Sequence, residues 1–389
     1  MKTPFRAAVA TMLPLALLLA AGNAPAQPLQ CEIDGAPVNP SNGATTAGKT
    51  GLMRCRDSDG KLQREQELRD GRFVGMRVFH DRDGSRREGR VNERGNTDGL
   101  QREFWPDGSL KREETALDGS IVGVARSFHP GGRPARIAHH APRQDNVPEN
   151  AIEFNPAGQV IRLACAPVNR LAETLEACGF SGERDTAIHN ARGDLVGRDT
   201  WNAGRLTRRV SLRDGRMLAS LENTAERRIE RSFHPDGTTV RQERESRLDA
   251  DGRPRSPREG ADREFAPGGQ KVREVLWSEG LAREEREWFQ NGSRKSETVR
   301  RPGAAPAQVR QFWDNDKPRL EEERVDQGTR GLGAVVGRQR LYRENGSLAQ
   351  EWFWNARGIR ERLREYDAEG KLTKEEEYFD DGSRKPASR

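Results

Sequence analysis

The sequence predicts an all-β protein, an elongated antiparallel β-meander of tandem β-hairpin repeats that also carries a short helical, disulfide-closed insert. Three observations carry this prediction. Turn-forming dipeptides recur every 11 to 12 residues, an aromatic residue precedes most turn glycines by four positions, and only 33% of the 389 residues are hydrophobic. A compact domain is normally nearer half apolar. We therefore expect a thin sheet in which each strand meets mainly its neighbours.

Evenly spaced glycines define the repeat. Two series stand out, at intervals of 24 and 12 residues respectively: Gly60, Gly84, Gly108 and Gly132, then Gly346, Gly358, Gly370 and Gly382. Many of these glycines follow Asn or Asp, and such dipeptides supply the positive φ angles that tight hairpin turns need. Turns at this spacing leave strands of about 6 to 8 residues.

Aromatic residues keep a fixed distance from the turns. The residues four positions before a turn glycine include Phe104, Phe128, Phe154, Phe233, Phe265, Trp288, Tyr342, Trp354, Tyr366 and Tyr378. Phe312 precedes Asp316 by the same step, so Asp316 is expected to replace the turn glycine. A leucine or valine often stands two positions after the glycine. Because strand side chains alternate, Leu372 and Tyr378, six residues apart, are expected on one face.

A second glycine lies nine residues before several turn glycines. These residues are Gly75, Gly99, Gly123 and Gly337. A glycine inside a strand pattern marks a β-bulge or a close approach of two backbones. We therefore predict an irregularity in the strand pairing at each of these positions.

Two segments combine all of these features: Gly-Leu-Gln-Arg-Glu-Phe-Trp-Pro-Asp-Gly at 99–108 and Gly-Arg-Gln-Arg-Leu-Tyr-Arg-Glu-Asn-Gly at 337–346. They resemble the MORN-variant repeat, and the resemblance extends over most of 55–135, 228–295 and 336–384. Proteins with this repeat include bacterial chains labelled YwqK-like antitoxins. The resemblance implies a meander of MORN-type hairpins and a binding or immunity role. It supplies no catalytic residues, so we expect a protein that is not an enzyme.

The first residues have the features of an export signal. Lys2 and Arg6 precede a short apolar run, and Ala24-Pro25-Ala26 matches a small-residue cleavage site. Residues 1–26 are therefore predicted to be a signal peptide. The mature protein is expected to be periplasmic or secreted. No later segment is apolar enough to predict a transmembrane span. The net charge of +6 falls to +4 without Lys2 and Arg6.

Four cysteines indicate two disulfides in an oxidising compartment. Pairing of neighbours, Cys31 with Cys55 and Cys165 with Cys178, is the simplest of three connectivities. Cys31 and Cys55 are one full repeat apart, which in a regular meander is too far for a disulfide, so we expect their strands to pair directly. In the second loop, Asn169 is expected to cap a short helix.

These features divide the chain into six segments. They are a signal peptide (1–26), an N-terminal disulfide cap (27–56), MORN-type repeats (57–138), an irregular middle with the Cys165/Cys178 insert (139–227), further repeats with Pro/Arg-rich interruptions (228–384) and a tail (385–389).

The cysteine, histidine and charged residues predict no catalytic site, metal site or cofactor. The cysteines lack a Cys-x-x-Cys spacing, and most histidines occupy repeat positions beside turns. Arginine and glutamate are interleaved throughout, whereas nucleic-acid binders concentrate basic charge on one face. We therefore expect no nucleic-acid partner.

Four aromatic residues stand out of phase with the others: Phe289, Trp313, Phe353 and Phe379. One interpretation is a recognition stripe on the outer face, because aromatic residues and arginine are favoured at interfaces. The other is that these rings cover the back of the sheet or pack between turns. The first predicts a non-catalytic exported scaffold that binds a protein or an envelope polymer through an extended sheet. The alternative function is a periplasmic immunity protein that neutralises a delivered toxin, and an envelope hydrolase is the least favoured hypothesis.

Overall fold

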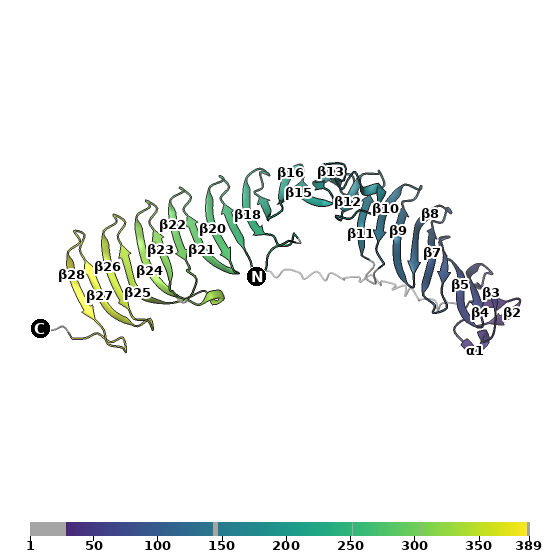
Figure 1. The fold of residues 1–389 in the computed structure, drawn as a ribbon, viewed down its shortest axis with the longest axis horizontal. Coiled ribbons are helices and arrows are strands. Elements are labelled where there is room, and N and C mark those ends of the chain that lie inside the picture. Colours follow the sequence, from purple (N-terminus) through teal and green to yellow (C-terminus); the bar gives the residue numbers. More distant parts are fainter. Residues whose placement is uncertain (1–28, 143–146, 251, 304, 387–389) are drawn as a thin grey trace, which may run out of the picture. The chain divides into compact units, whose positions relative to one another are not determined.

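The computed structural model describes residues 29–142, 147–250, 252–303 and 305–386. The described chain is almost entirely β (Figure 1), so the predicted antiparallel meander is confirmed. Its contacts divide it into two compact units, residues 1–108 and 109–389. The boundary falls inside the segment 57–138 that the sequence treats as one repeat array. The predicted signal peptide, residues 1–26, lies outside the described residues.

The first unit is one antiparallel sheet in the order β7-β6-β5-β4-β3-β1-β2. Its elements are β1 (Gln30–Ile33), β2 (Ala36–Val38), α1 (Gly43–Thr46), β3 (Gly51–Arg56), β4 (Leu62–Arg69), β5 (Arg72–His80), β6 (Arg86–Val91) and β7 (Thr97–Phe104). Cys31 on β1 lies directly opposite Cys55 on β3, and the two form a disulfide. The predicted direct pairing of these strands is therefore confirmed. Ile33, Met53 and Leu68 pack around the bond as a small core.

The second unit begins with five strands in sequential order. They are β8 (Leu110–Leu117), β9 (Ser120–Phe128), β10 (Pro134–His140), β11 (Pro148–Phe154) and β12 (Val160–Ala164). Of the described residues, no helix is long and apolar enough to cross a membrane.

A 16-stranded antiparallel sheet completes the second unit, again in sequential order. Its strands are β13 (Arg184–His189), β14 (Leu195–Asn202), β15 (Arg205–Arg213), β16 (Arg216–Asn223), β17 (Arg227–Phe233), β18 (Val240–Arg247), β19 (Gly260–Phe265), β20 (Lys271–Ser278), β21 (Leu281–Trp288), β22 (Arg294–Val299), β23 (Ala307–Phe312), β24 (Pro318–Asp326), β25 (Leu332–Tyr342), β26 (Leu348–Trp354), β27 (Arg360–Tyr366) and β28 (Leu372–Glu377). A 3-10 turn, η2 (Gly328–Arg330), joins β24 to β25.

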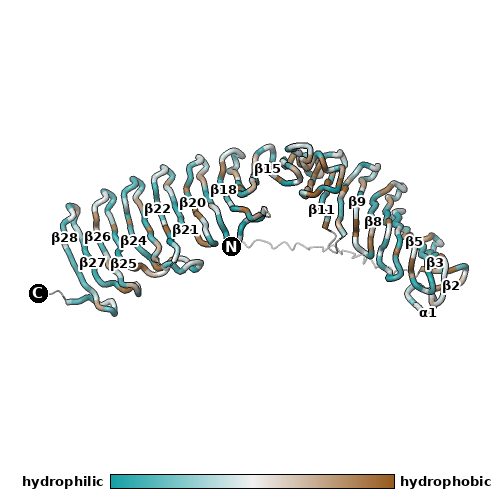
Figure 2. Tube along the Cα trace, in the orientation of Figure 1, coloured by the Kyte–Doolittle hydropathy of each residue, from teal (hydrophilic) through white to brown (hydrophobic). Residues whose placement is uncertain are grey.

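The insert between β12 and β13 is closed by the predicted Cys165–Cys178 disulfide. It contains a 3-10 turn, η1 (Ala172–Thr174), and its buried Leu171 packs with Ile152 and Trp201 in a second core. Figure 2 shows hydrophobic residues gathered around this region. The prediction that Asn169 caps the helix is wrong, because Leu171 is the cap residue. The Asn169 side chain instead accepts a hydrogen bond from the Leu171 backbone at 2.8 Å.

The middle of the chain is more regular than the sequence predicts. Strands β13 to β16 lie within residues 139–227 and pair without interruption, so the irregular part is the insert. The turns at Ala203-Gly204 and Asp214-Gly215 each contain two residues with positive φ. Such turns need no aromatic residue four positions earlier. The spacing rule therefore did not detect these hairpins.

Positive φ angles confirm two predictions about the repeat. Asp316 has a φ of +63°, so it does replace the turn glycine after Phe312. The second glycines, Gly75, Gly99, Gly123 and Gly337, have φ angles of +68°, +87°, +70° and +66°. The pairing register shifts beside each of them, because three residues of the glycine strand oppose one residue of its partner. These glycines therefore form β-bulges.

The prediction that Leu372 and Tyr378 share one face is wrong. The register shifts between Glu365 and Tyr366, and the pairing skips Thr373. An unpaired residue after the turn inverts the alternation of the following side chains. Leu372 therefore lies beside Tyr366, whereas the Tyr378 ring lies within 4.9 Å of Arg360, which also stacks on Trp352. Aromatic residues consequently occupy both faces of the sheet.

The disulfide of the insert offers a stability test. Replacing Cys165 and Cys178 by serine opens a loop with a sequence separation of 13 residues. The chain-entropy account assigns about 3 kcal/mol to a loop of this size. We expect the double variant to lose about that amount in urea unfolding followed by tryptophan fluorescence. A fully reduced wild-type protein that unfolds at the same urea concentration as the oxidised protein would contradict this expectation.

Candidate binding surface

One row of alternating arginine and glutamate side chains crosses strands β17 to β28. Register pairs each member with the next, strand by strand, and we call this set the charged row: Arg231, Glu243, Arg263, Glu274, Arg286, Glu297, Arg310, Glu321, Arg340, Glu351, Arg364 and Glu375. Adjacent strands lie about 4.8 Å apart. The sign of the charge therefore changes at each step of about that length.

Ion pairs link most of the row. Arg263 contacts Glu243 and Glu274, each at 2.9 Å, so one guanidinium joins three strands. The same contact recurs further along, between Arg340 and Glu351 at 3.1 Å. Opposite charges that face each other across strands stabilise a sheet by roughly 0.2–1 kcal/mol per pair. The row thus supplies cross-strand stabilisation where the sheet has few buried apolar side chains.

Several glutamates of the row are largely buried. Glu274 and Glu351 expose 12% and 8% of their side chains. Burial raises the pKa of Glu274, but hydrogen bonds donated by Arg263 and Lys271 outweigh it, so its pKa lies below the ordinary value of 4.5. Burial lowers the pKa of Arg263, and its hydrogen bonds to Glu274 and Glu243 outweigh that effect in the same way. Both partners therefore stay charged at neutral pH.

A row of aromatic side chains runs beside the charged row, at the ends of the same strands and on the same face. Its members are Phe233, Phe265, Trp288, Phe312, Tyr342 and Tyr366. Basic side chains from neighbouring strands stack on two of them, with Lys271 at 4.5 Å from the Trp288 ring and Arg294 at 4.6 Å from the Phe312 ring. The Tyr342 hydroxyl donates a hydrogen bond to Glu321 of the charged row at 2.8 Å. We call the two rows together the charged face.

The side chain of the residue that follows the aromatic position can form a hydrogen bond to the backbone of the next turn. His129 and His234 each hydrogen-bond through Nε2, at 2.9 Å, to the backbone carbonyl of the aromatic residue in the next turn on that edge. A carbonyl oxygen only accepts, so Nε2 carries the proton. Trp313 donates to the Tyr342 carbonyl in the same way at 3.3 Å. The two histidines thus have a structural role that needs no catalysis.

The four out-of-phase aromatic residues lie at separate places. Phe289 and Trp313 stand in the turns after β21 and β23, and the Arg319 guanidinium lies 5.0 Å from the Trp313 ring. Phe353 lies on the charged face, where the guanidiniums of Arg338, Arg362 and Arg364 come within 5.4 to 5.8 Å of its ring. Phe379 follows β28 and is 48% exposed. They do not form one continuous stripe, and their part in binding stays a prediction.

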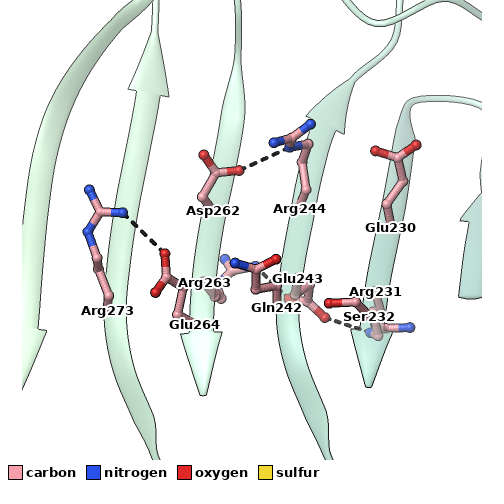
Figure 3. Close-up of a pocket in the computed structure, with 10 residues that line it drawn as sticks. All are labelled: Glu230, Arg231, Ser232, Gln242, Glu243, Arg244, Asp262, Arg263, Glu264 and Arg273. Atoms are coloured by element: carbon pink, nitrogen blue, oxygen red, sulfur yellow. Dashed lines mark hydrogen bonds and ion pairs between the residues drawn. The ribbon is translucent and has the colours of Figure 1, made fainter. Parts of the chain in front are cut away.

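A shallow hollow of about 470 Å³ lies over β17 to β20. Figure 3 shows its lining, which consists of polar and charged residues that are largely paired with one another, as in Arg244 with Asp262 and Arg273 with Glu264. Within the described residues, no cluster of three or more histidine, cysteine or acidic side chains could hold a metal ion. The hollow therefore offers a surface for polar contacts.

The charged row was missed in the sequence, although a signal for it exists. Every row arginine stands six positions before a turn glycine or Asp316, and every row glutamate except Glu243 stands five positions after one, as Arg364 and Glu375 do around Gly370. The turn geometry fixes these offsets relative to the aromatic positions.

Comparisons with known proteins agree with the repeat architecture. The family model of the MORN repeat variant matches residues 97–117, which span β7 and β8. MORN-type repeats are therefore present in this chain. A search of curated proteins finds no match.

Two solved structures show a distant likeness. "Crystal Structure of TcdB2-TccC3-TEV" matches with 13% sequence identity and a TM-score of 0.17, over 86% of this chain and 18% of that chain. "Crystal Structure of TcdB2-TccC3 without hypervariable C-terminal region" matches with 10% identity and a TM-score of 0.14, over 86% and 22%. The chain thus spans about a fifth of each matched chain, and a likeness at this level carries no inference about function.

The charged row predicts a measurable stability effect. Glu274→Gln removes the negative charge shared by Arg263, Lys271 and Arg286, which lie at 2.9, 3.2 and 3.9 Å. Loss of this largely buried charge and its ion pairs should cost about 1–3 kcal/mol in urea unfolding at pH 7, although Arg263 and Arg286 keep their other glutamates. Glu264→Gln is the matched control, because this carboxylate on the adjacent strand is 41% exposed. The control should change stability by less than about 0.5 kcal/mol.

The same pair of variants gives the pH dependence. The folded pKa of Glu274 lies below the unfolded value, so its stabilising contribution is present above about pH 4.5 and is lost as the pH falls through the folded pKa. The difference in unfolding free energy between wild type and Glu274→Gln should therefore shrink on acidification. A difference that stays constant from pH 7 to pH 3 would count against the ion pairs as its cause.

Proposed function

We propose that this protein is an exported, non-catalytic repeat scaffold that binds another protein through its charged face. The single observation that carries the proposal is the open sheet of β17 to β28. Within the described residues, no helix or second sheet packs on these strands, and their only substantial neighbours are the adjacent strands. A sheet with both faces open presents the charged face directly to a partner.

The pattern of charge favours a protein over a polyanionic polymer on this face. Arginine and glutamate alternate along the whole charged row, so a polyanion would meet a carboxylate at every second strand. A protein surface can place groups of both signs at matching positions. Phe353, surrounded by Arg338, Arg362 and Arg364, adds the aromatic and arginine chemistry that is enriched at protein interfaces.

Export is supported by the two disulfides. Cys31–Cys55 and Cys165–Cys178 leave no free cysteine among the described residues. Disulfides of this kind persist in oxidising compartments such as the bacterial periplasm. Together with the export signal expected at residues 1–26, they support a location in the periplasm or outside the cell.

The immunity function implied by the resemblance is a special case of the same proposal, with a delivered toxin as the partner. It needs the same exposed face and makes the more specific demand that binding abolishes a toxic activity. Co-expression of the exported chain with a periplasm-directed toxin encoded beside it separates the two. Binding without protection from the toxin would leave the scaffold function and remove immunity.

The scaffold function is tested with immobilised mature protein and quantitative mass spectrometry of captured envelope proteins. Phe353→Ala and Arg362→Gln alter the charged face, whereas Arg357→Gln removes the same charge from the exposed turn after β26, where Arg357 pairs with Asp380 at 2.8 Å. We expect one captured protein to fall about tenfold with each face variant, which is the effect of losing an interface anchor. Arg357→Gln should retain it.

Two outcomes would oppose the scaffold function. One is a set of captured proteins that is identical for wild type, face variants and control. The other is an envelope hydrolase activity of the purified protein that survives removal of contaminating enzymes.

A further inference from the structure

Three arginines surround one phenylalanine in the first unit. Phe79 on β5 lies opposite Arg64 on β4 and opposite Arg87 on β6, and Arg77 stands two residues before it on its own strand. Their guanidinium carbons lie 5.4, 5.5 and 5.9 Å from the centre of the Phe79 ring, in the order Arg64, Arg87, Arg77. We call these three residues the arginine cluster.

The cluster is short of acidic partners. Asp81 binds Arg87 through two hydrogen bonds, at 3.2 and 3.1 Å. Among the described residues, no carboxylate forms an ion pair within 4.0 Å of Arg64 or Arg77. The Nε atom of Arg64 is buried and has no hydrogen-bond partner. This arrangement differs from that of Arg263 in the second unit, which contacts three glutamates.

Mutual repulsion is the electrostatic consequence. Burial lowers the pKa of Arg64, and the nearby charge of Arg77 lowers it further. Burial also lowers the pKa of Arg77, and Arg87 adds to that effect. The pKa of the ion-paired Arg263 is raised instead. Arg64 and Arg77 therefore hold half-buried positive charge that no ion pair among the described residues compensates.

Packing alone does not account for the cluster. Arg64 also stacks on Phe73 at 4.9 Å, so one arginine lies between two phenyl rings. One stacked cation contributes about 0.5–2 kcal/mol. That contribution explains Arg64, but it does not explain why Arg77 and Arg87 converge on the same ring, where like charges oppose each other.

We propose that the arginine cluster binds a multiply charged oxyanion of the phosphate class, presented as a free ion or as a soluble phosphate ester. The forked guanidinium group matches the geometry of phosphate oxygens and donates paired hydrogen bonds to them. An anion between the three side chains would supply the compensation that Arg64 and Arg77 lack. The proposal concerns another unit and another ligand than the scaffold function.

The charge of the whole unit argues against a membrane as the source of the anion. Residues 29–108 contain 14 lysines and arginines and 14 aspartates and glutamates, which gives a net charge of zero. Attraction to an anionic bilayer amounts to about 1 kcal/mol per basic residue near the surface, and it depends on an excess of basic charge. The excess here is local to the cluster, which suits a small anionic group.

The test uses the full mature protein and inorganic pyrophosphate in isothermal titration calorimetry. Wild type should bind saturably, and Arg77→Gln and Arg87→Gln should each weaken binding about tenfold, the loss of one charge-assisted contact. Arg86→Gln is the matched control. Arg86 is the neighbour of Arg87 on β6, but its guanidinium stacks on Phe104 at 4.3 Å and pairs with Glu88 at 3.5 Å, on the other face. The control should bind within about twofold of wild type.

The unfolding temperature without ligand is a second measurement. It separates the proposed binding role from a purely structural role of the cluster. Arg77→Gln relieves repulsion, so we expect the free variant to unfold at the same temperature as wild type or higher, while pyrophosphate no longer stabilises it. A structural role predicts a lower unfolding temperature and unchanged pyrophosphate binding, which would overturn the proposal. Absence of saturable binding by wild type, or an equal loss in Arg86→Gln, would overturn it as well.

A vesicle experiment tests whether the bound anion is instead a lipid headgroup. Sedimentation with phosphatidylglycerol vesicles, compared with phosphatidylcholine vesicles, should show no binding that depends on Arg77. If phosphatidylglycerol vesicles bind the protein through Arg77 while pyrophosphate does not bind, the soluble phosphate class is wrong and the cluster recognises a membrane surface.

Discussion

Cross-strand pairing of side chains is the constraint on which the second unit depends. Among the residues that the structure describes, no further layer packs on β17 to β28, so the apolar burial that stabilises most domains is scarce. Contacts between side chains on adjacent strands take its place, and they include the charged row and the aromatic row beside it. Where the insert supplies a cover, the same register position becomes apolar, as Ile137, Ile152 and Leu163 show.

The turns determine which side chains meet. Most long turns are followed by an unpaired residue that shifts the register, so the alternation of side chains begins again in the next strand, whereas the turn between β5 and β6 has no such shift. Because of this shift, the aromatic residue before the turn lies on the same face as the glutamate that follows the turn glycine by five positions. A hairpin without the shift would bring glutamate to the opposite side and break the charged row. The unpaired residues therefore determine which side chains share a face as well as the path of the backbone.

The backbone plan could be predicted from spacing, because glycine, asparagine and aspartate report directly on backbone angles. Both disulfides were predicted as the simplest pairing of neighbouring cysteines, and the Cys31–Cys55 bond led in turn to the prediction of directly paired strands. The faces could not be assigned correctly, because strict alternation ignores unpaired residues such as Thr373. The hairpins at Ala203-Gly204 and Asp214-Gly215 were missed for a related reason, since a two-residue turn leaves no aromatic signal. The arginine cluster depends on register between three strands and has no signature in local sequence.

The arginines of the charged row and those of the arginine cluster differ in role. The first group stabilises the sheet, and the second is proposed to bind a ligand. In the charged row, each sign is followed by the opposite sign, and hydrogen bonds to Glu274 and Glu243 raise the pKa of Arg263 despite its burial. Around Phe79, only Arg87 of the three arginines has an acidic partner among the described residues, and the pKa of Arg64 and of Arg77 is lowered. Charges that are satisfied within the chain contribute to folding and present a patterned surface. Charges that remain uncompensated after folding weaken the folded state, and a bound anion removes that cost. A repeat protein can thus place a ligand site on an open sheet by leaving part of one arginine cluster unpaired.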